Sequence, residues 1–196
     1  MNRRRAVIVA LIAVLLVAAV ATLYVTRWRP RQAVDAVTYL SNPSGPPPQP
    51  MPVDQAVAEI QALHEENGGS TVNLYFGDLG GAELYAVSLY PDRSVVVEGS
   101  DIPEDVLRSF IEANEQLLQD PRVSVGTWYN SENGLTYLDL SATLPDREEA
   151  IELGRQYNQI AIFDLSTFEE IETGGTGEAI EDLPPAGERL PEWETN

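Results

Sequence analysis

Residues 122–144, RVSVGTWYNSENGLTYLDLSATL, predict a long β-hairpin. Both halves are rich in β-branched and aromatic residues, and the pair Asn133-Gly134 between them favours a tight turn. Successive side chains of a strand point to opposite faces, so the second half should have one aliphatic and one more polar face. The aliphatic set is Leu138, Leu140 and Ala142, and the opposite set is Tyr137, Asp139 and Ser141.

Strands and helices are expected on both sides of this hairpin. The strands are 71–77, 82–90, 94–99 and 160–165, and the helices are 53–66, 101–118 and 146–157. Short connections between the first three strands predict an antiparallel meander. The expected class is α+β: a mostly antiparallel sheet of five to six strands with two to three helices packed on one face, preceded by one transmembrane helix.

The transmembrane helix is expected at residues 6–25, AVIVALIAVLLVAAVATLYV, a stretch without any charged residue. A helix of this length is about 30 Å long and matches the hydrocarbon core of a bilayer. A signal peptide cleaved after Ala21 is the alternative, because Ala19 and Ala21 have the small-x-small spacing of a cleavage site. Arginines flank the segment equally, and the N-terminal amine favours an N-terminus inside the cell, which places the main domain outside the cytoplasm.

The chain is expected to divide into five parts. They are a basic head (1–5), the transmembrane anchor (6–25), an Arg-flanked, Pro-rich stalk (26–52), an α+β globular domain (53–172) and an acidic disordered tail (173–196). Six of the twelve residues of 41–52 are proline, which favours a stiff spacer, although a ligand for a proline-binding domain has a similar composition. The tail is rich in Glu, Gly and Pro and poor in core-forming residues.

Charge separates the N-terminal segment from the rest of the chain. Six of the 12 basic residues precede Asp35, whereas all 31 acidic residues lie from Asp35 onward. The resulting charge of −25 over that part repels nucleic acid, so DNA and RNA binding are not expected. It favours either attraction of a basic partner or simply solubility.

Several kinds of chemistry are excluded or disfavoured by residue content. The chain has no cysteine, which excludes disulfides, thiolate metal sites and cysteine nucleophiles. The single histidine, His64, is expected in the last turn of its helix, where a cationic ring would favour the helix dipole. The glycine-rich stretch TGGTGE at 173–178 lacks the lysine of a phosphate loop and is interpreted as a terminator. We expect no metal and no cofactor.

Aromatic side chains suggest a binding face. Tyr75, Tyr85, Trp128 and Tyr137 alternate with aliphatic positions and are expected together on the sheet face away from the helices. Exposed tyrosine and tryptophan are typical of protein- or glycan-binding faces, although large rings also cover an otherwise bare sheet. Asp139 is expected on the same face as Tyr137. It is either a solvent-facing strand residue or one acid of a hydrolase whose second acid the sequence does not identify.

A helix is expected to run directly into a strand at RQYNQIAIFDL, residues 155–165. Tyr157 and Gln159 lie at this joint and form either a binding site or a corner, and Asn158 suits a left-handed helix end in place of glycine. Residues 149–165 resemble small uncharacterised bacterial and phage α+β domains in which a helix ends in a Tyr-x-Gln step and enters a strand. The resemblance implies the helix-to-strand joint and brings no assigned activity.

Together these features predict a single-pass, membrane-anchored and non-enzymatic envelope protein. Residues 6–25 are expected to anchor the chain in the membrane, and its acidic α+β domain is expected to interact with another protein. An envelope hydrolase that uses carboxylates around Asp139 is the alternative. A third hypothesis is a cytoplasm-facing domain that engages a basic partner.

Overall fold

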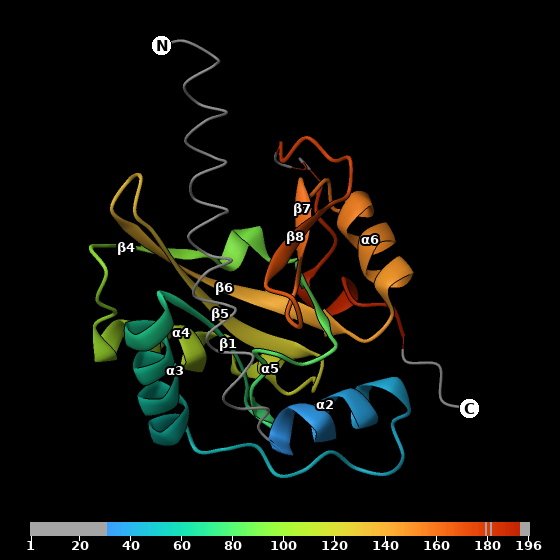
Figure 1. Cartoon of the computed structure of the whole chain (residues 1–196), viewed down its shortest axis with the longest axis horizontal. Coiled ribbons are helices and arrows are strands. Elements are labelled where there is room, and N and C mark those ends of the chain that lie inside the picture. The colour runs from blue at the N-terminus through green and yellow to red at the C-terminus, as the bar shows by residue number, and fades with distance from the viewer. Residues whose placement is uncertain (1–30, 179, 181, 193–196) are drawn as a thin grey trace.

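The computed structural model describes residues 31–178, 180 and 182–192. Over these residues the chain forms five α-helices and eight strands (Figure 1). The helices are α2 (Arg31–Ser41), α3 (Val53–Asn67), α4 (Glu104–Ala113), α5 (Glu115–Leu118) and α6 (Arg147–Gln156). The strands are β1 (Gly69–Asn73), β2 (Gly77–Asp78), β3 (Tyr85–Ser88), β4 (Val95–Glu98), β5 (Val123–Asn130), β6 (Leu135–Leu144), β7 (Ala161–Asp164) and β8 (Glu169–Glu172). Short 3-10 turns follow Tyr90 (η1, Pro91–Arg93) and Pro185 (η2, Ala186–Glu188).

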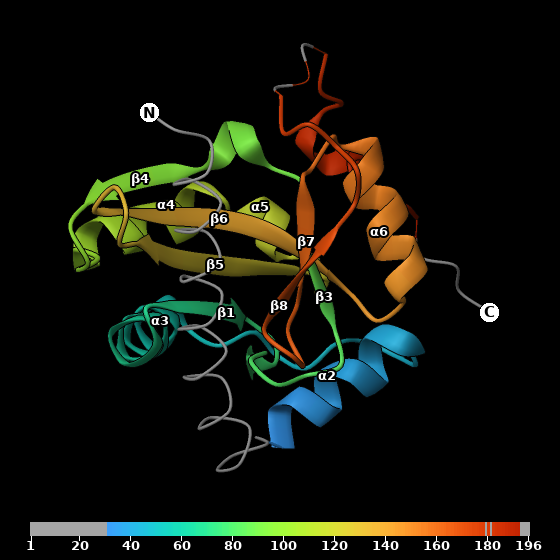
Figure 2. The same ribbon diagram turned by 45° about the horizontal axis from the view of Figure 1, so that its top comes forward.

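The prediction of the fold class was wrong in two respects. The sheet has more strands and the chain more helices than predicted, and the helices do not all pack on one face of the sheet. The fold is α+β with one antiparallel sheet in the order β2-β1-β5-β6-β3-β7-β8, with β4 also pairing β6. The sheet is curled, and β7 and β8 run steeply across the direction of β5 and β6 (Figure 2). No helix among the described residues is long and apolar enough to cross a membrane. The predicted transmembrane helix, 6–25, lies outside the described residues.

The central hairpin of β5 and β6 is confirmed. Val125 pairs with Leu140, and the register continues over eight residue pairs. Gly134 takes the left-handed conformation at φ 70°, and its N–H donates to Asn130 O at 2.8 Å, which closes the turn. The left-handed Gly134 therefore ends the four-residue loop, residues 131–134, that joins the two longest strands.

The predicted meander of the first three strands was wrong. β1 pairs with β2 and β5, whereas β3 and β4 both pair with one edge of β6. β3 takes the second half of that edge and β4 the first half, so they form one interrupted strand. The interruption arises because the consecutive residues Leu89 and Tyr90 are both buried in the core and Pro91 follows them, which strand alternation does not allow.

The main core lies between the sheet and helices α3 to α6. Strand residues such as Val72, Val125 and Leu140 are fully buried there against Ile60 and Leu107 of the helices. Helix α3 ends as predicted, with Gly68 left-handed at φ 73° and its N–H bonded to His64 O at 2.8 Å. The predicted helix 101–118 is instead two helices, because the helical backbone is interrupted at Asn114. The first of them, α4, begins after Pro103, and Asp101 does not cap it.

A second, smaller core covers one end of the opposite sheet face. It consists of Ala36 and Leu40 from α2 and Phe76, Leu79, Ala82, Leu84 and Leu165. The segment 26–52, predicted as a stalk, thus contains a helix that packs on the domain, and Met51 N donates to Leu74 O at 2.7 Å. Apolar residues at 36 and 40 lie one helical turn apart, which allows both to face this core.

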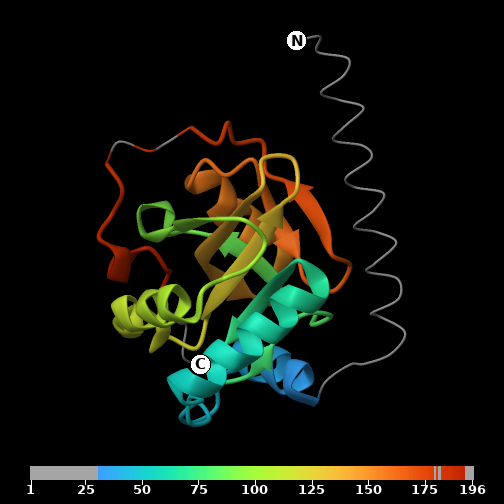
Figure 3. The same cartoon turned by 90° about the vertical axis from the view of Figure 1, so that its left-hand side faces the viewer.

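The C-terminal segment, predicted as a disordered tail, is held on the domain over residues 182–192. Figure 3 shows it wrapping around one side of the domain. The Arg189 side chain is buried, donates to Leu89 O at 3.0 Å and Pro184 O at 2.8 Å, and forms an ion pair with Asp92. Strand β8 lies just before this segment and extends the sheet beyond the last predicted strand.

Candidate functional site

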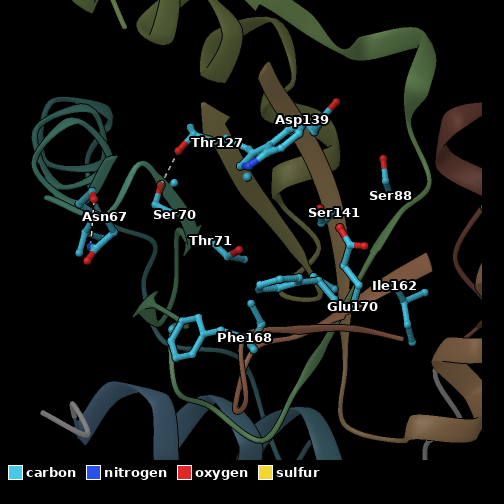
Figure 4. A pocket seen from close by; sticks show the side chains of 18 of the residues that line it. Asn67, Ser70, Thr71, Ser88, Thr127, Asp139, Ser141, Ile162, Phe168 and Glu170 are labelled. Carbon is cyan, nitrogen blue, oxygen red and sulfur yellow. Dashed lines mark hydrogen bonds between the residues drawn. The ribbon is translucent and has the colours of Figure 1, made fainter. Parts of the chain in front are cut away.

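A groove of about 390 Å³ opens on the sheet face that α3 to α6 leave uncovered (Figure 4). Its residues come from α3, from all strands except β4, from the loop after β2 and from the turn between β7 and β8. The lining includes Gly126, Trp128, Asp139, Ser141, Phe163, Phe168 and Glu170.

Small residues form the floor of the groove. Thr71, Gly126 and Asp139 lie directly opposite one another across β1, β5 and β6, so they point to the same face. A Cβ atom at residue 126 would have Ser141 Oγ at 3.6 Å and Asp139 O at 3.7 Å as its nearest neighbours, so it would make ordinary van der Waals contacts without a clash. A ligand can therefore approach the strand backbone closely at the centre of the floor.

Asp139 lies opposite the interruption between β3 and β4. Leu138 pairs with Val95 and Ser141 with Ser88, which leaves residue 139 without a strand partner on that side. The Ser94 hydroxyl fills this gap and donates a hydrogen bond to Asp139 Oδ1. Burial raises the pKa of the Asp139 carboxyl above its ordinary value, and the Ser94 hydrogen bond opposes that rise.

Phe168 forms another part of the wall, in a strained backbone conformation. It lies in the turn between β7 and β8 at φ 59°, a left-handed value that is uncommon for a bulky side chain. Asp164 holds the turn, since its Oδ1 accepts from Ser166 N at 2.8 Å and its carbonyl oxygen accepts from Phe168 N at 2.8 Å. Such a conformation costs about 1–3 kcal/mol and persists where the surroundings require it.

Two of the four predicted aromatic residues come together at the groove. The rings of Trp128 and Tyr137 are stacked, with centroids 5.7 Å apart and planes at 26°. Tyr85 instead packs against the main core, two positions from the buried Val87. Tyr75 lies in the turn between β1 and β2, where its hydroxyl donates to Gln119 O at 2.8 Å. Tyr75 and Tyr85 therefore do not belong to the groove.

Tyr157, Asn158 and Gln159 form a structural corner rather than part of the groove. The left-handed conformation predicted for Asn158 is confirmed, at φ 51°. The Tyr157 ring is buried in the main core, and its hydroxyl donates to Arg189 O at 3.2 Å. Gln159 N donates to Gly154 O at 2.8 Å, which satisfies a carbonyl at the end of α6. The glycine-rich stretch 173–178 wraps this corner, with Thr176 N bonded to Asn158 Oδ1 at 2.9 Å.

His64 is buried and has a structural environment. Its Nδ1 lies 3.0 Å from Thr127 Oγ1, and its Nε2 lies 3.0 Å from Ser100 O. Burial lowers the pKa of the ring, which favours the neutral form. Among the described residues, no three His, Cys, Asp or Glu side chains are grouped as metal ligands.

Phe168, Ser141, Gly126 and Glu170 were not singled out from the sequence as site residues. The placement of Gly126, Ser141 and Glu170 depends on the pairing of strands that are distant in the chain. Phe168 lies in a turn, where the sequence has no alternation of apolar and polar residues that would indicate its position. The left-handed Phe168 follows Asp164-Leu165-Ser166-Thr167, and this Asp-Ser composition indicates a turn but does not indicate its aromatic wall.

Comparison of this chain with family models, with curated proteins and with solved structures finds no match.

Proposed function

We propose that this protein is a non-enzymatic binding protein that holds an extended segment of a partner protein in the groove. In this proposal residues 6–25 anchor the chain in the cell membrane, and the acidic domain lies outside the cytoplasm. The uncharged length of that segment and the arginines on both sides of it support the anchor.

The observation that carries the proposal is that two residues unfavourable for folding line the same groove. Asp139 is a carboxylate whose charge is penalised by burial, and Phe168 has a left-handed backbone that glycine would adopt without strain. Neither feature is explained by packing of the core. Residues that break local rules at a cost in stability are expected mainly at functional sites.

The shape of the groove favours an extended chain over a compact ligand. Its floor consists of strand backbone at glycine, serine and threonine residues, and aromatic rings lie on its walls. A polypeptide in extended form presents alternating side chains to such a surface while its backbone stays close to the floor.

A peptide array tests this proposal. The full chain in detergent is incubated with an array of random ten-residue peptides, beside the variants Gly126→Leu and Gly187→Leu. Leucine at 126 fills the groove, whereas a Cβ at 187 has no atom within 4 Å and serves as the matched control. We expect a set of peptides that wild type and Gly187→Leu bind and Gly126→Leu does not. Binding of no peptide, or of the same set by all three proteins, would overturn the proposal.

The second candidate is a hydrolase that uses Asp139. The observation that favours it is the raised pKa of Asp139 in a groove that also holds Glu170. Mass spectrometry of the same peptides after incubation separates the two functions. Cleavage by wild type that Asp139→Asn abolishes would favour the hydrolase, whereas intact peptides support the binding protein.

A topology reporter fused to the C-terminus tests the location of the domain. Activity of a reporter that works only outside the cytoplasm is expected. Activity of a cytoplasmic reporter instead would favour the third hypothesis, a domain facing the cytoplasm.

A further inference from the structure

Among the residues that the structure describes, the ionisable side chains that line the groove are all acidic. They are Asp78, Asp139 and Glu170. Asp78 Oδ1 already accepts a hydrogen bond from Gly80 N at 2.9 Å. The Glu170 carboxylate has no hydrogen-bond or ion-pair partner within the part of the chain that the structure describes, and Asp139 accepts one bond from Ser94. Both carboxylates therefore have oxygen lone pairs that a cationic ligand can use.

An exposed apolar row continues from the groove to the edge of the sheet. Val96 pairs with Tyr137, and Tyr137 pairs with Trp128, so the three side chains lie side by side on one face of β4, β6 and β5. Val96 is 52% exposed and Trp128 is 55% exposed. We call these three residues the apolar ledge. Neighbouring strands lie about 4.8 Å apart, so the ledge spans about 10 Å.

The ledge and the groove form one continuous surface, because Trp128 belongs to both. A small cation would use only the acidic part and leave the ledge bare. A chain that crosses several strands can use both parts at once, with a charged side chain in the groove and an apolar side chain on the ledge.

We infer that the partner segment is an extended basic peptide whose arginine or lysine pairs with Asp139 while an apolar side chain two residues away, on the same side of the extended chain, rests on the ledge. This inference rests on the proposed function and adds the chemistry of the ligand. An arginine suits the site best, since its planar group donates two hydrogen bonds to a carboxylate and stacks on an aromatic face such as that of Trp128. The net charge of −25 from Asp35 onward also accelerates the approach of a basic partner.

The test uses fluorescence anisotropy with three probes and the full chain in detergent. The first probe is a fluorescein-labelled eight-residue peptide, Arg-Ser-Leu-Ser-Arg-Ser-Leu-Ser, in which arginine and leucine alternate along one side of the extended chain. The second has citrulline in place of each arginine, which keeps the shape and removes the charge. The third is unlabelled arginine amide as a competitor. The variants are Asp139→Asn, Gly126→Leu and, as a matched loss of one charge on the helical side of the sheet, Asp105→Asn of α4.

We expect the arginine peptide to bind at least about tenfold more tightly than the citrulline peptide. Asp139→Asn should remove most of this difference, Asp105→Asn should keep it, and Gly126→Leu should weaken both peptides. Equal binding of the two peptides, with both lost in Gly126→Leu, overturns the basic specificity but leaves the groove as a peptide site. Equal weakening by Asp139→Asn and Asp105→Asn shows attraction by the overall charge and also overturns it.

Two further outcomes would also overturn the inference. If arginine amide displaces the arginine peptide at concentrations similar to the peptide's own dissociation constant, the ligand is a small cation and the inference fails. If Gly126→Leu changes the binding of neither peptide, the groove is not a peptide site, and the proposed function fails with the inference.

Discussion

Ser94 donates a hydrogen bond to Asp139 across the interruption between β3 and β4. The hydrogen bond helps to hold a carboxylate at the edge of the groove where burial disfavours its charge. Burial raises the folded-state pKa of Asp139 above the ordinary 3.8. The stability contributed by the protonated Asp139 carboxyl is therefore fully present below the unfolded pKa and is lost as pH rises through the folded pKa.

Asp139→Asn should stabilise the protein at pH 7, because the amide keeps an acceptor for Ser94 and removes a partly buried charge. The difference in free energy of unfolding between variant and wild type should shrink as pH falls towards 4. Urea unfolding at several pH values measures this difference. A variant less stable than wild type at pH 7 would show that the Asp139 charge stabilises the fold, and would remove one of the two arguments for a functional groove.

Phe168 gives a second prediction, on the cost of the left-handed turn. Phe168→Gly and Phe168→Ala both remove the ring, but only glycine relieves the backbone, so the glycine variant should be more stable by about 1 kcal/mol. At Thr167, which has no positive φ, the order should reverse, with alanine at least as stable as glycine. Chemical denaturation of the four variants checks both signs. Equal stability of the two Phe168 variants would contradict the strain.

Local signals in the sequence predicted local structure well. The Asn133-Gly134 turn and the left-handed Asn158 both depend on neighbouring residues. The pairing of β3 and β4 with β6 could not be predicted in this way. It depends on Leu89 and Tyr90 entering a core that distant strands build.

The groove was only partly predictable for the same reason. Alternation along β6 placed Tyr137 and Asp139 on the open face, and the same rule placed Trp128 there. Strand β8 reads EEIE and has one apolar residue, so its pattern did not indicate a strand, and Glu170 was missed with it. Helix α2 was hidden beside the proline-rich stretch, although Ala36 and Leu40 have helical spacing.

A third prediction concerns His64 and mildly acidic pH. A carbonyl only accepts, so Nε2 donates to Ser100 O and the neutral ring accepts from the Thr127 hydroxyl at Nδ1. Burial lowers the pKa of His64 in the folded state. The stability contributed by the neutral ring is therefore fully present above the unfolded pKa of 6.5 and is lost as pH falls through the folded pKa. His64→Gln can keep both hydrogen bonds and should remove this part of the pH dependence. Parallel stability profiles of wild type and variant from pH 7.5 to 5 would contradict the prediction.

A fourth prediction compares two arginines that pair with Asp92. Arg189 has a side chain only 4% exposed, whereas that of Arg93 is 44% exposed and lies 3.7 Å from the same carboxylate. Arg189→Met should destabilise the protein by about 2 kcal/mol, because it also loses the bonds to Leu89 O and Pro184 O. Arg93→Met should cost less than about 1 kcal/mol. Limited proteolysis should cut the C-terminal segment faster only in Arg189→Met, and equal protection would show that other contacts hold this segment.

The last prediction concerns the close approach of residue 175 to the corner after α6. A Cβ atom there would lie 2.1 Å from Gln159 O and 2.7 Å from Asn158 C, both of them backbone atoms that a rotamer change does not move. Gly175→Ala should therefore cost about 2 kcal/mol or more of unfolding free energy. Gly187→Ala, with no atom within 4 Å of the new Cβ, should stay within about 0.5 kcal/mol of wild type. Because the corner lies outside the groove, Gly175→Ala that remains folded should bind the arginine-leucine peptide like wild type. Weaker binding by that folded variant would show instead that the corner supports the site.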